Sequence, residues 1–162
     1  MAAQIEDTDK VIACVEDVKQ AVQSVAEFTN RTVFVYDQKD AADKLKGLQV
    51  FPAATIIYEG MRVVESSNPA PQSSGRMGSS ANLVVSIMVV DQGNQGLIKS
   101  DTRIPVMNLL GKLRRQMLDR RSPAGHFWKF VVEAEAAPAN GLIFWVQRWQ
   151  TPLQLQHGPV KG

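Results

Sequence analysis

The sequence is poor in cysteine and histidine, the side chains on which many metal sites and catalytic centres depend. Its 162 residues include one cysteine, Cys14, and two histidines, His126 and His157. One cysteine cannot form an internal disulfide, and neither histidine has a carboxylate or cysteine at a metal-ligand spacing. The valines around Cys14 favour a buried thiol, with a reactive thiol as the alternative. We expect neither a metal nor a cofactor.

Catalytic motifs are missing as well. The sequence contains no GxSxG nucleophile elbow, no P-loop and no GxGxxG turn. Glu133 and Glu135 share one face of an expected strand and could form an acid–base pair, but such carboxylates more often lie on the solvent side of a half-buried strand. We therefore expect no catalytic residue and a protein that is not an enzyme.

Long hydrophobic runs and a strong excess of one charge are absent too. The longest apolar stretch, 83–90, is interrupted by Ser86 and is far shorter than the roughly 20 residues that a membrane-spanning helix needs. The first residues are acidic and lack the apolar centre of a signal peptide. The formal net charge of +2 does not by itself indicate a nucleic-acid partner. We expect a protein that acts in a cytoplasm-like compartment and has no membrane partner.

The residues that are present suit one globular domain. Hydrophobic residues make up 44% and charged residues 21% of the chain, close to the average of globular proteins. A chain of this length buries enough surface to fold without disulfides or metals. We expect a single domain over 1–162.

Two segments have the apolar spacing of amphipathic helices. The first is expected to start at Asp7 or Thr8 and to end before Asn30. The second is expected to begin at Ser100 or Asp101 and carries basic residues along its second half. The two apolar stripes are Val11, Val15, Val18, Val22 and Val25, and Val106, Leu110, Leu113 and Met117.

Short β-branched and aromatic runs predict the strands. The runs 54–58 and 61–65 flank a Glu-Gly pair and are expected to form a hairpin with each other. The run 83–90 is apolar on both faces, which predicts a central strand covered on both sides. The expected strands are 32–36, 54–58, 61–65, 83–90, 126–135 and 142–150, with one or two helical turns at 40–46.

Two segments are predicted to lie outside the regular elements. Serine, proline and glycine dominate 66–81, and because its flanks are strand-like we expect a long hairpin tip rather than a domain linker. The tail from Thr151 has few apolar residues, which predicts an extended end. The order of elements predicts an α+β fold: a mostly antiparallel sheet of about five to six strands with two long helices packed on it.

Two other classes of protein fit parts of the sequence. The runs 33–36, 50–52, 56–60 and 63–64 resemble the strand, cis-proline and hairpin of thioredoxin-like domains, but Cys14 has no CxxC partner. The basic half of the second expected helix could meet phosphates, or it could face water or an acidic protein. A thioredoxin-like domain and a nucleic-acid-binding accessory protein therefore stay as alternatives.

Four segments together have the pattern of one family. They are the N-terminal helix before TVFVY, the segment FPAATIIYEG, the polar loop with GRMGSSANLVVSIMVV, and the helix PVMNLLGKLRRQML before an aromatic C-terminal hairpin. Through them the chain resembles, over residues 5–151, the tail terminator (tail completion) proteins of tailed bacteriophages. These are small minor tail proteins that cap the tail tube.

The resemblance implies a structural virion protein with particular partners. Such proteins form a hexameric ring on the last ring of the tail tube, end tail polymerisation and present a surface to the neck of the head. The implied partners are further copies of the chain, the tail tube protein, and sheath and neck or connector proteins, with DNA only as cargo in the lumen. The implied location is the head-proximal end of the tail, after assembly in the host cytoplasm. Neck and head–tail joining (head completion) proteins have similar size and remain the alternative.

A ring requires each copy to offer two different surfaces. Trp149 could serve as an aromatic anchor for one of them, with a place in the core as the alternative. The segment 66–81 is long enough to reach a neighbouring ring and to order on contact. The partner-interface candidates are Arg76, Met77, Arg114, Arg115, Arg120, Arg121, Arg148 and Trp149.

Overall fold

The computed structural model describes residues 2–28, 33–36, 51–63, 79–92, 100–139 and 141–155, which form two long helices and one sheet. The helices are α1 (Ala2–Gln23) and α3 (Ser100–Met117), and a short 3₁₀ helix, η1 (Ala26–Phe28), follows α1. The strands are β1 (Val33–Tyr36), β2 (Ala53–Val63), β3 (Ser79–Gln92), β4 (Lys129–Ala139) and β5 (Leu142–Leu155). The predicted α+β class is confirmed.

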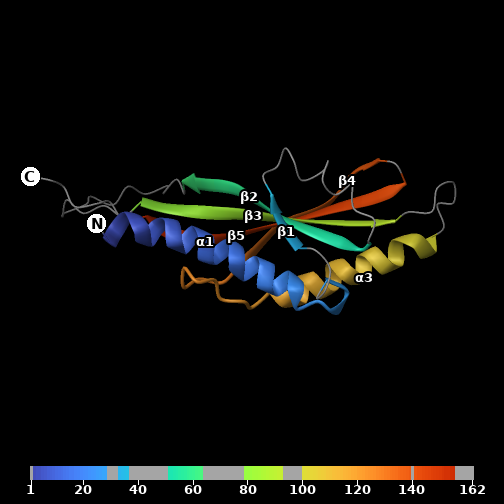
Figure 1. Cartoon of the computed structure of the whole chain (residues 1–162), viewed down its shortest axis with the longest axis horizontal. Helices are drawn as coiled ribbons and strands as arrows, with labels where there is room; N and C mark the ends of the chain where they lie inside the picture. The colour runs from blue at the N-terminus through green and yellow to red at the C-terminus, as the bar shows by residue number, and fades with distance from the viewer. Residues whose placement is uncertain are drawn as a thin grey trace, which may run out of the picture.

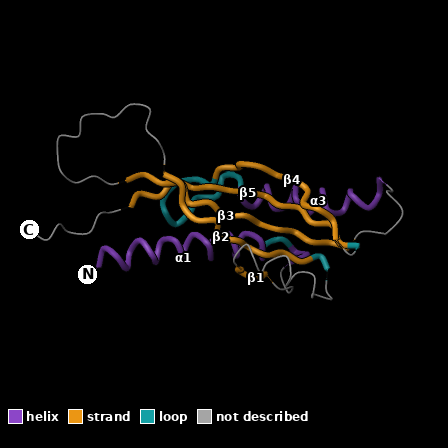
Figure 2. Tube along the Cα trace, turned by 90° about the horizontal axis from the view of Figure 1, so that it is seen from above, coloured by secondary structure: helices purple, strands orange, loops and turns teal. Residues whose placement is uncertain are grey.

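The sheet has the strand order β1-β2-β3-β5-β4. β2, β3, β5 and β4 pair antiparallel, and β1 extends the sheet by pairing in parallel with β2. The mostly antiparallel sheet is confirmed, and its described part has five strands, of which four pair antiparallel. In Figure 2, β1 and β4 lie at opposite edges.

Both helices cover the same face of the sheet (Figure 1). α1 packs against β1, β2 and β3, while α3 lies under β5 and β4 and contacts α1. The apolar stripes predicted for the two helices point into this layer, and all their members are buried except Val11, which is half-buried. Burial of each large aliphatic side chain contributes roughly 1.5–3 kcal/mol, so the stripes hold the helices on the sheet.

β3 is buried on both faces, as its two-sided apolar pattern predicts. Leu83, Val85 and Ile87 belong to the core under the helices, whereas Val84 and Val90 point to the other face and are also buried. Its neighbours in the sheet are β2 and β5. The central position predicted for this strand is therefore confirmed.

The hairpin predicted between 54–58 and 61–65 is wrong. Residues 54–58 and 61–63 belong to the single strand β2, and both parts pair with β3 instead of with each other, while 64 and 65 lie outside the described residues. The pairing register shifts between Tyr58 and Gly60, and Gly60 has a φ of 98°. A glycine adopts this conformation without steric penalty, so the Glu59-Gly60 pair produces a bulge inside a strand and not a turn.

Several predicted boundaries also differ from the structure. α1 begins at Ala2, several residues before the expected cap, and β4 begins at Lys129. Ser79, assigned to the polar loop, opposes Leu155 at the start of β3, because pairing with a neighbouring strand outweighs a serine-rich composition. The turns predicted at 40–46 and the loop residues 66–78 lie outside the described residues.

The tail predicted to be extended from Thr151 is corrected in one respect: its first residues are extended but belong to the sheet, and 156–162 lie outside the described residues. β5 continues to Leu155, and Thr151 and Leu153 are buried against the helix-covered face of the sheet. Alternate residues of this segment point inward, so a strand can be half-buried although its overall composition is polar.

This correction predicts that the end of β5 contributes to stability. Leu153→Ala should lower the free energy of unfolding by about 2–5 kcal/mol, because it leaves a cavity in the core. Gln154→Ala, at the exposed neighbouring position, should change it by no more than about 0.5 kcal/mol. Urea denaturation followed by circular dichroism measures both, and equal effects would mean that 151–155 does not pack on the core.

Candidate functional site

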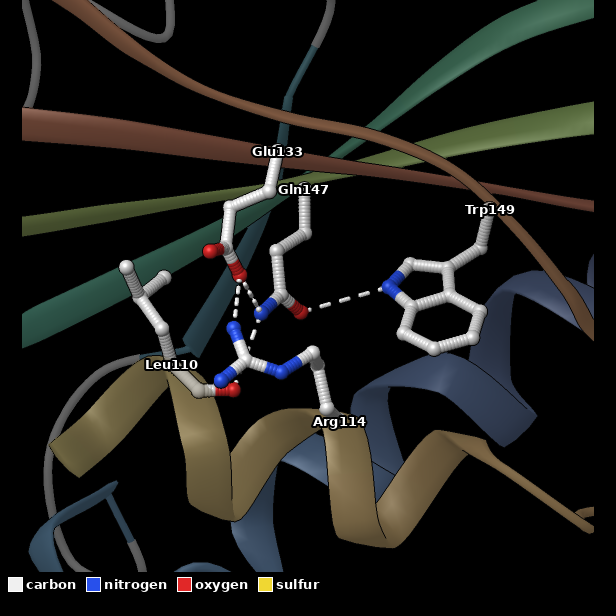
Figure 3. Close-up of polar contacts among 5 residues, drawn as sticks. All are labelled: Leu110, Arg114, Glu133, Gln147 and Trp149. Atoms are coloured by element: carbon white, nitrogen blue, oxygen red, sulfur yellow. Dashed lines mark hydrogen bonds and ion pairs between the residues drawn. The ribbon is translucent and has the colours of Figure 1, made fainter. Parts of the chain in front are cut away.

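A buried polar network connects α3 to the β4–β5 hairpin (Figure 3). Gln147 is fully buried, and its Nε2 donates hydrogen bonds to the Leu110 carbonyl oxygen at 2.9 Å and to Glu133 Oε1 at 2.8 Å. Its Oε1 accepts a hydrogen bond from Trp149 Nε1 at 3.3 Å. Arg114 donates to the same oxygen of Glu133 and forms an ion pair with it. Each buried polar group of Gln147 is satisfied, so the network fixes the position of α3 on the sheet.

The position of Glu133 corrects its predicted place on the solvent side of the strand. The pairing of β4 with β5 shifts in register between Phe130 and Val132, so Val131 is a bulged residue that changes which face the following side chains occupy. Glu133 therefore faces α3, while Glu135 is exposed. The two carboxylates share one face of β4, as predicted, and Glu133 is engaged by Arg114 and Gln147.

A second network connects α1 to the segment between α3 and β4. Asp17 accepts hydrogen bonds from Arg120 Nε at 3.0 Å and from Trp128 Nε1 at 2.8 Å. Cys14, one turn before Asp17, is fully buried, and burial raises the pKa of its thiol. A buried thiol with a raised pKa is largely protonated at neutral pH, so the interpretation of Cys14 as a small core residue is confirmed.

A third polar contact lies on the sheet face that the helices leave uncovered. Arg148 of β5 donates from Nε to Glu59 Oε2 at 2.6 Å and from Nη2 to Glu59 Oε1 at 3.0 Å. Ser86 of β3 opposes Arg148 in the register, so this bidentate pair passes over the central strand. The hydrogen bonds with Glu59 raise the pKa of Arg148.

These contacts change the interpretation of the predicted partner-interface residues. Trp149 is fully buried. The alternative prediction that it belongs to the core is therefore confirmed, and the prediction that it anchors a partner at the surface is wrong. Arg114, Arg120 and Arg148 are engaged in ion pairs within the chain. Arg115 and Arg121 are exposed, and Arg76 and Met77 lie outside the described residues.

Large apolar side chains are exposed at one edge of the sheet, around the start of β4. Phe127 is 52% exposed, and the bulged Val131 is 41% exposed. The guanidinium carbon of Arg121 lies over the Phe127 ring, 5.5 Å from the ring centroid. The rings of Phe130 and Trp149 meet edge to face, with their centroids 5.3 Å apart. The register places Phe130 on the helix-covered face, beside Trp149, and Val132 on the other face, beside Arg148, so these side chains wrap around the edge of the sheet. Together with the exposed residue after α3, we name them the β4 patch: Leu118, Phe127, Phe130, Val131 and Val132.

A different group of apolar side chains is exposed where α1 lies beside β2. Val63 is 71% exposed and Ile12 is 56% exposed. A hollow of about 280 Å³ lies between the helix and Tyr58, lined by apolar residues of α1 and by Glu16. Partial burial there raises the pKa of Tyr58. We name these side chains the β2 patch: Ile12, Tyr58, Met61 and Val63.

Sequence reasoning missed both patches. The run Phe130-Val131-Val132 places apolar residues on consecutive positions, where a half-buried strand would alternate. That run was the signal available in the sequence, because such a strand exposes apolar side chains if it lies at an edge. The β2 patch gives no such signal, since it forms only when α1 packs beside β2.

Three further findings concern metal ligands, membrane-spanning helices and similarity to known proteins. Among the described residues, no group of three or more His, Cys, Asp and Glu side chains is placed to hold a metal ion. None of the described helices is long and apolar enough to cross a membrane. The sequence matches no known family and none of the characterised proteins with which it was compared.

The ion pairs predict that the basic residues near the end of α3 differ in their effect on stability. Arg120→Gln should lower the free energy of unfolding by about 1–3 kcal/mol, because Asp17 would lose a charged donor in a mostly buried position. Arg115→Gln should change it by no more than about 0.5 kcal/mol. Chemical denaturation of both variants tests this, and an unchanged Arg120→Gln variant would show that the Asp17 contact does not hold α1.

Proposed function

We propose that the protein is a structural component of a phage tail: a tail terminator that assembles as a ring, with six copies as the expected number. In this role it binds the last ring of the tail tube, stops its growth and joins the tail to the neck. Its partners would be further copies of itself, the tail tube protein, and sheath and neck proteins, with DNA only passing through the lumen.

One observation carries the proposal: among the described residues, large apolar side chains are exposed in two groups at separate places, with Met107 exposed apart from them. The β4 patch and the β2 patch together expose nine such side chains, each by 36% or more. Groups of exposed apolar residues on soluble chains mark surfaces that bind other proteins. A protein that works by assembly needs such surfaces, whereas an isolated enzyme domain needs one concave site.

The segments that carry the family resemblance provide further support, because they fold into one unit. TVFVY and FPAATIIYEG contribute β1 and the first part of β2, which pair with each other. The segment ending in SIMVV is the central strand β3, and PVMNLLGKLRRQML is most of α3. The aromatic hairpin is β4–β5. The resemblance therefore follows the core of the fold and not its surface alone.

The alternatives receive less support from the described residues. A neck or head–tail joining protein would use the same kind of surfaces and remains the second candidate. A thioredoxin-like redox role requires a reactive thiol, and Cys14 is fully buried with a raised pKa. A nucleic-acid-binding role requires available cations, and Lys112, Arg114 and Arg120 are paired with carboxylates of the same chain.

The proposal predicts concentration-dependent assembly. Light scattering over a concentration series should show a shift from monomer to a closed oligomer, and electron micrographs should show rings or caps at the ends of purified tail tubes. A protein that stays monomeric at every concentration and does not bind tail tubes would contradict the proposal. Binding to duplex DNA that weakens steeply with salt, without attachment to tubes, would favour the nucleic-acid alternative.

A further inference from the structure

We propose that the β4 patch of one copy packs against the β2 patch of the next copy, so that one repeated, heterologous interface closes the ring. This inference rests on the proposed function and specifies the two surfaces that meet in the ring. A heterologous contact joins two different patches. Copies related by this contact form a closed ring when the rotation from each copy to the next adds up to a full turn. The chain offers two patches of different composition.

The two patches lie where a ring interface requires them. β4 is the last strand at one edge of the sheet, and β2 is separated from it by β5 and β3 and lies next to β1 at the other edge. α1 contacts β2, and in Figure 2 β4 and α1 lie on opposite sides of β3. A copy placed on one patch therefore leaves the other patch available for the next copy.

The shapes and side chains of the two patches complement each other. The β2 patch borders a shallow apolar hollow of about 280 Å³, and the β4 patch presents Phe127 and Phe130 as large aromatic side chains. Buried aromatic anchors that fill pockets dominate the energy of many interfaces. The hollow is slightly smaller than the roughly 300–1,000 Å³ typical of small-molecule sites, so inserted side chains suit it better than a cofactor.

The charge at the hollow has the opposite sign to most of the exposed charges around the β4 patch. Glu16 is exposed and is the one charged residue among the described residues lining the hollow. Around the β4 patch, Arg115, Arg121 and Lys129 are exposed, together with two acids, Asp119 and Glu135. Opposite charges at the rims of two apolar surfaces increase the association rate and fix their register. A second copy of the chain therefore satisfies both the apolar and the charged features.

The contact is made through side chains and not by extending the sheet from one copy to the next. The bulge at Val131 interrupts the regular pairing of β4, and Lys129 places a charge at the start of this strand. Bulges and edge lysines are features that prevent an edge strand from pairing with another chain. The exposed apolar side chains remain available for packing.

Two double variants test the interface, one for each patch. The first is Ile12→Lys with Val63→Lys, which disrupts the β2 patch. The second is Leu118→Glu with Val131→Glu, which disrupts the β4 patch. All four positions are exposed by 41% or more, so both variants should fold, as circular dichroism and thermal unfolding would verify. Gln20→Lys and Gln154→Glu, at other exposed positions, are the matched controls.

Each double variant alone should remain monomeric at concentrations where the wild-type protein assembles, with association weakened at least about 30-fold. An equimolar mixture of the two should form a heterodimer, because the intact β4 patch of the first meets the intact β2 patch of the second. The controls should assemble like the wild type. If a double variant unfolds, Val63→Lys and Val131→Glu as single substitutions provide the same comparison.

The outcomes separate this inference from the proposed function. A variant that assembles normally, or a mixture that yields no heterodimer while the wild type forms oligomers, would overturn the interface and leave the ring in place. A mixture without heterodimer is what a symmetric contact of one patch with itself would give. A wild-type protein that never assembles, with or without tail tubes, would overturn both.

Discussion

The antiparallel ladder between β3 and β5 is the interaction on which the rest of the structure depends. It runs along both strands from the Ser79–Leu155 pair to the Gln92–Leu142 pair. β2 is added on one side and β4 on the other, and the face of this ladder supplies Leu83, Ile87 and Trp149 to the core under the helices. Loss of this ladder would remove the surface on which both helices pack.

The helices are positioned by directional contacts as well as by burial. Gln147 and Glu133 hold α3, and Asp17 holds the segment after α3 against α1. These polar contacts keep the arginines near the end of α3 occupied within the chain. Fewer arginines are consequently free at the surface than the sequence suggests, and most of the exposed large apolar side chains among the described residues lie in the β2 and β4 patches.

The elements with a strong periodic pattern could be predicted from the sequence, and those decided by tertiary pairing could not. The valine stripe of α1 predicts a helix packed on a core, and the two-sided apolar pattern of β3 predicts a central strand. The segment at Gly60 and the end of β5 depend on which strand lies alongside, and local composition does not contain that information. The candidate site was harder to predict than the fold. In the sequence a basic residue such as Arg114 is a candidate for binding a partner, and the fold is needed to show that it pairs with Glu133.

Association of the chain through two different apolar surfaces, as proposed, can be measured by hydrogen–deuterium exchange. Exchange is compared between dilute protein and protein at the concentration where oligomers form. We expect protection to rise together in two regions, around 127–132 and around 11–16 with 58–63, while the β3–β5 ladder is protected under both conditions. Oligomers that form with a rise in protection at only one of these regions, or at neither, would contradict it.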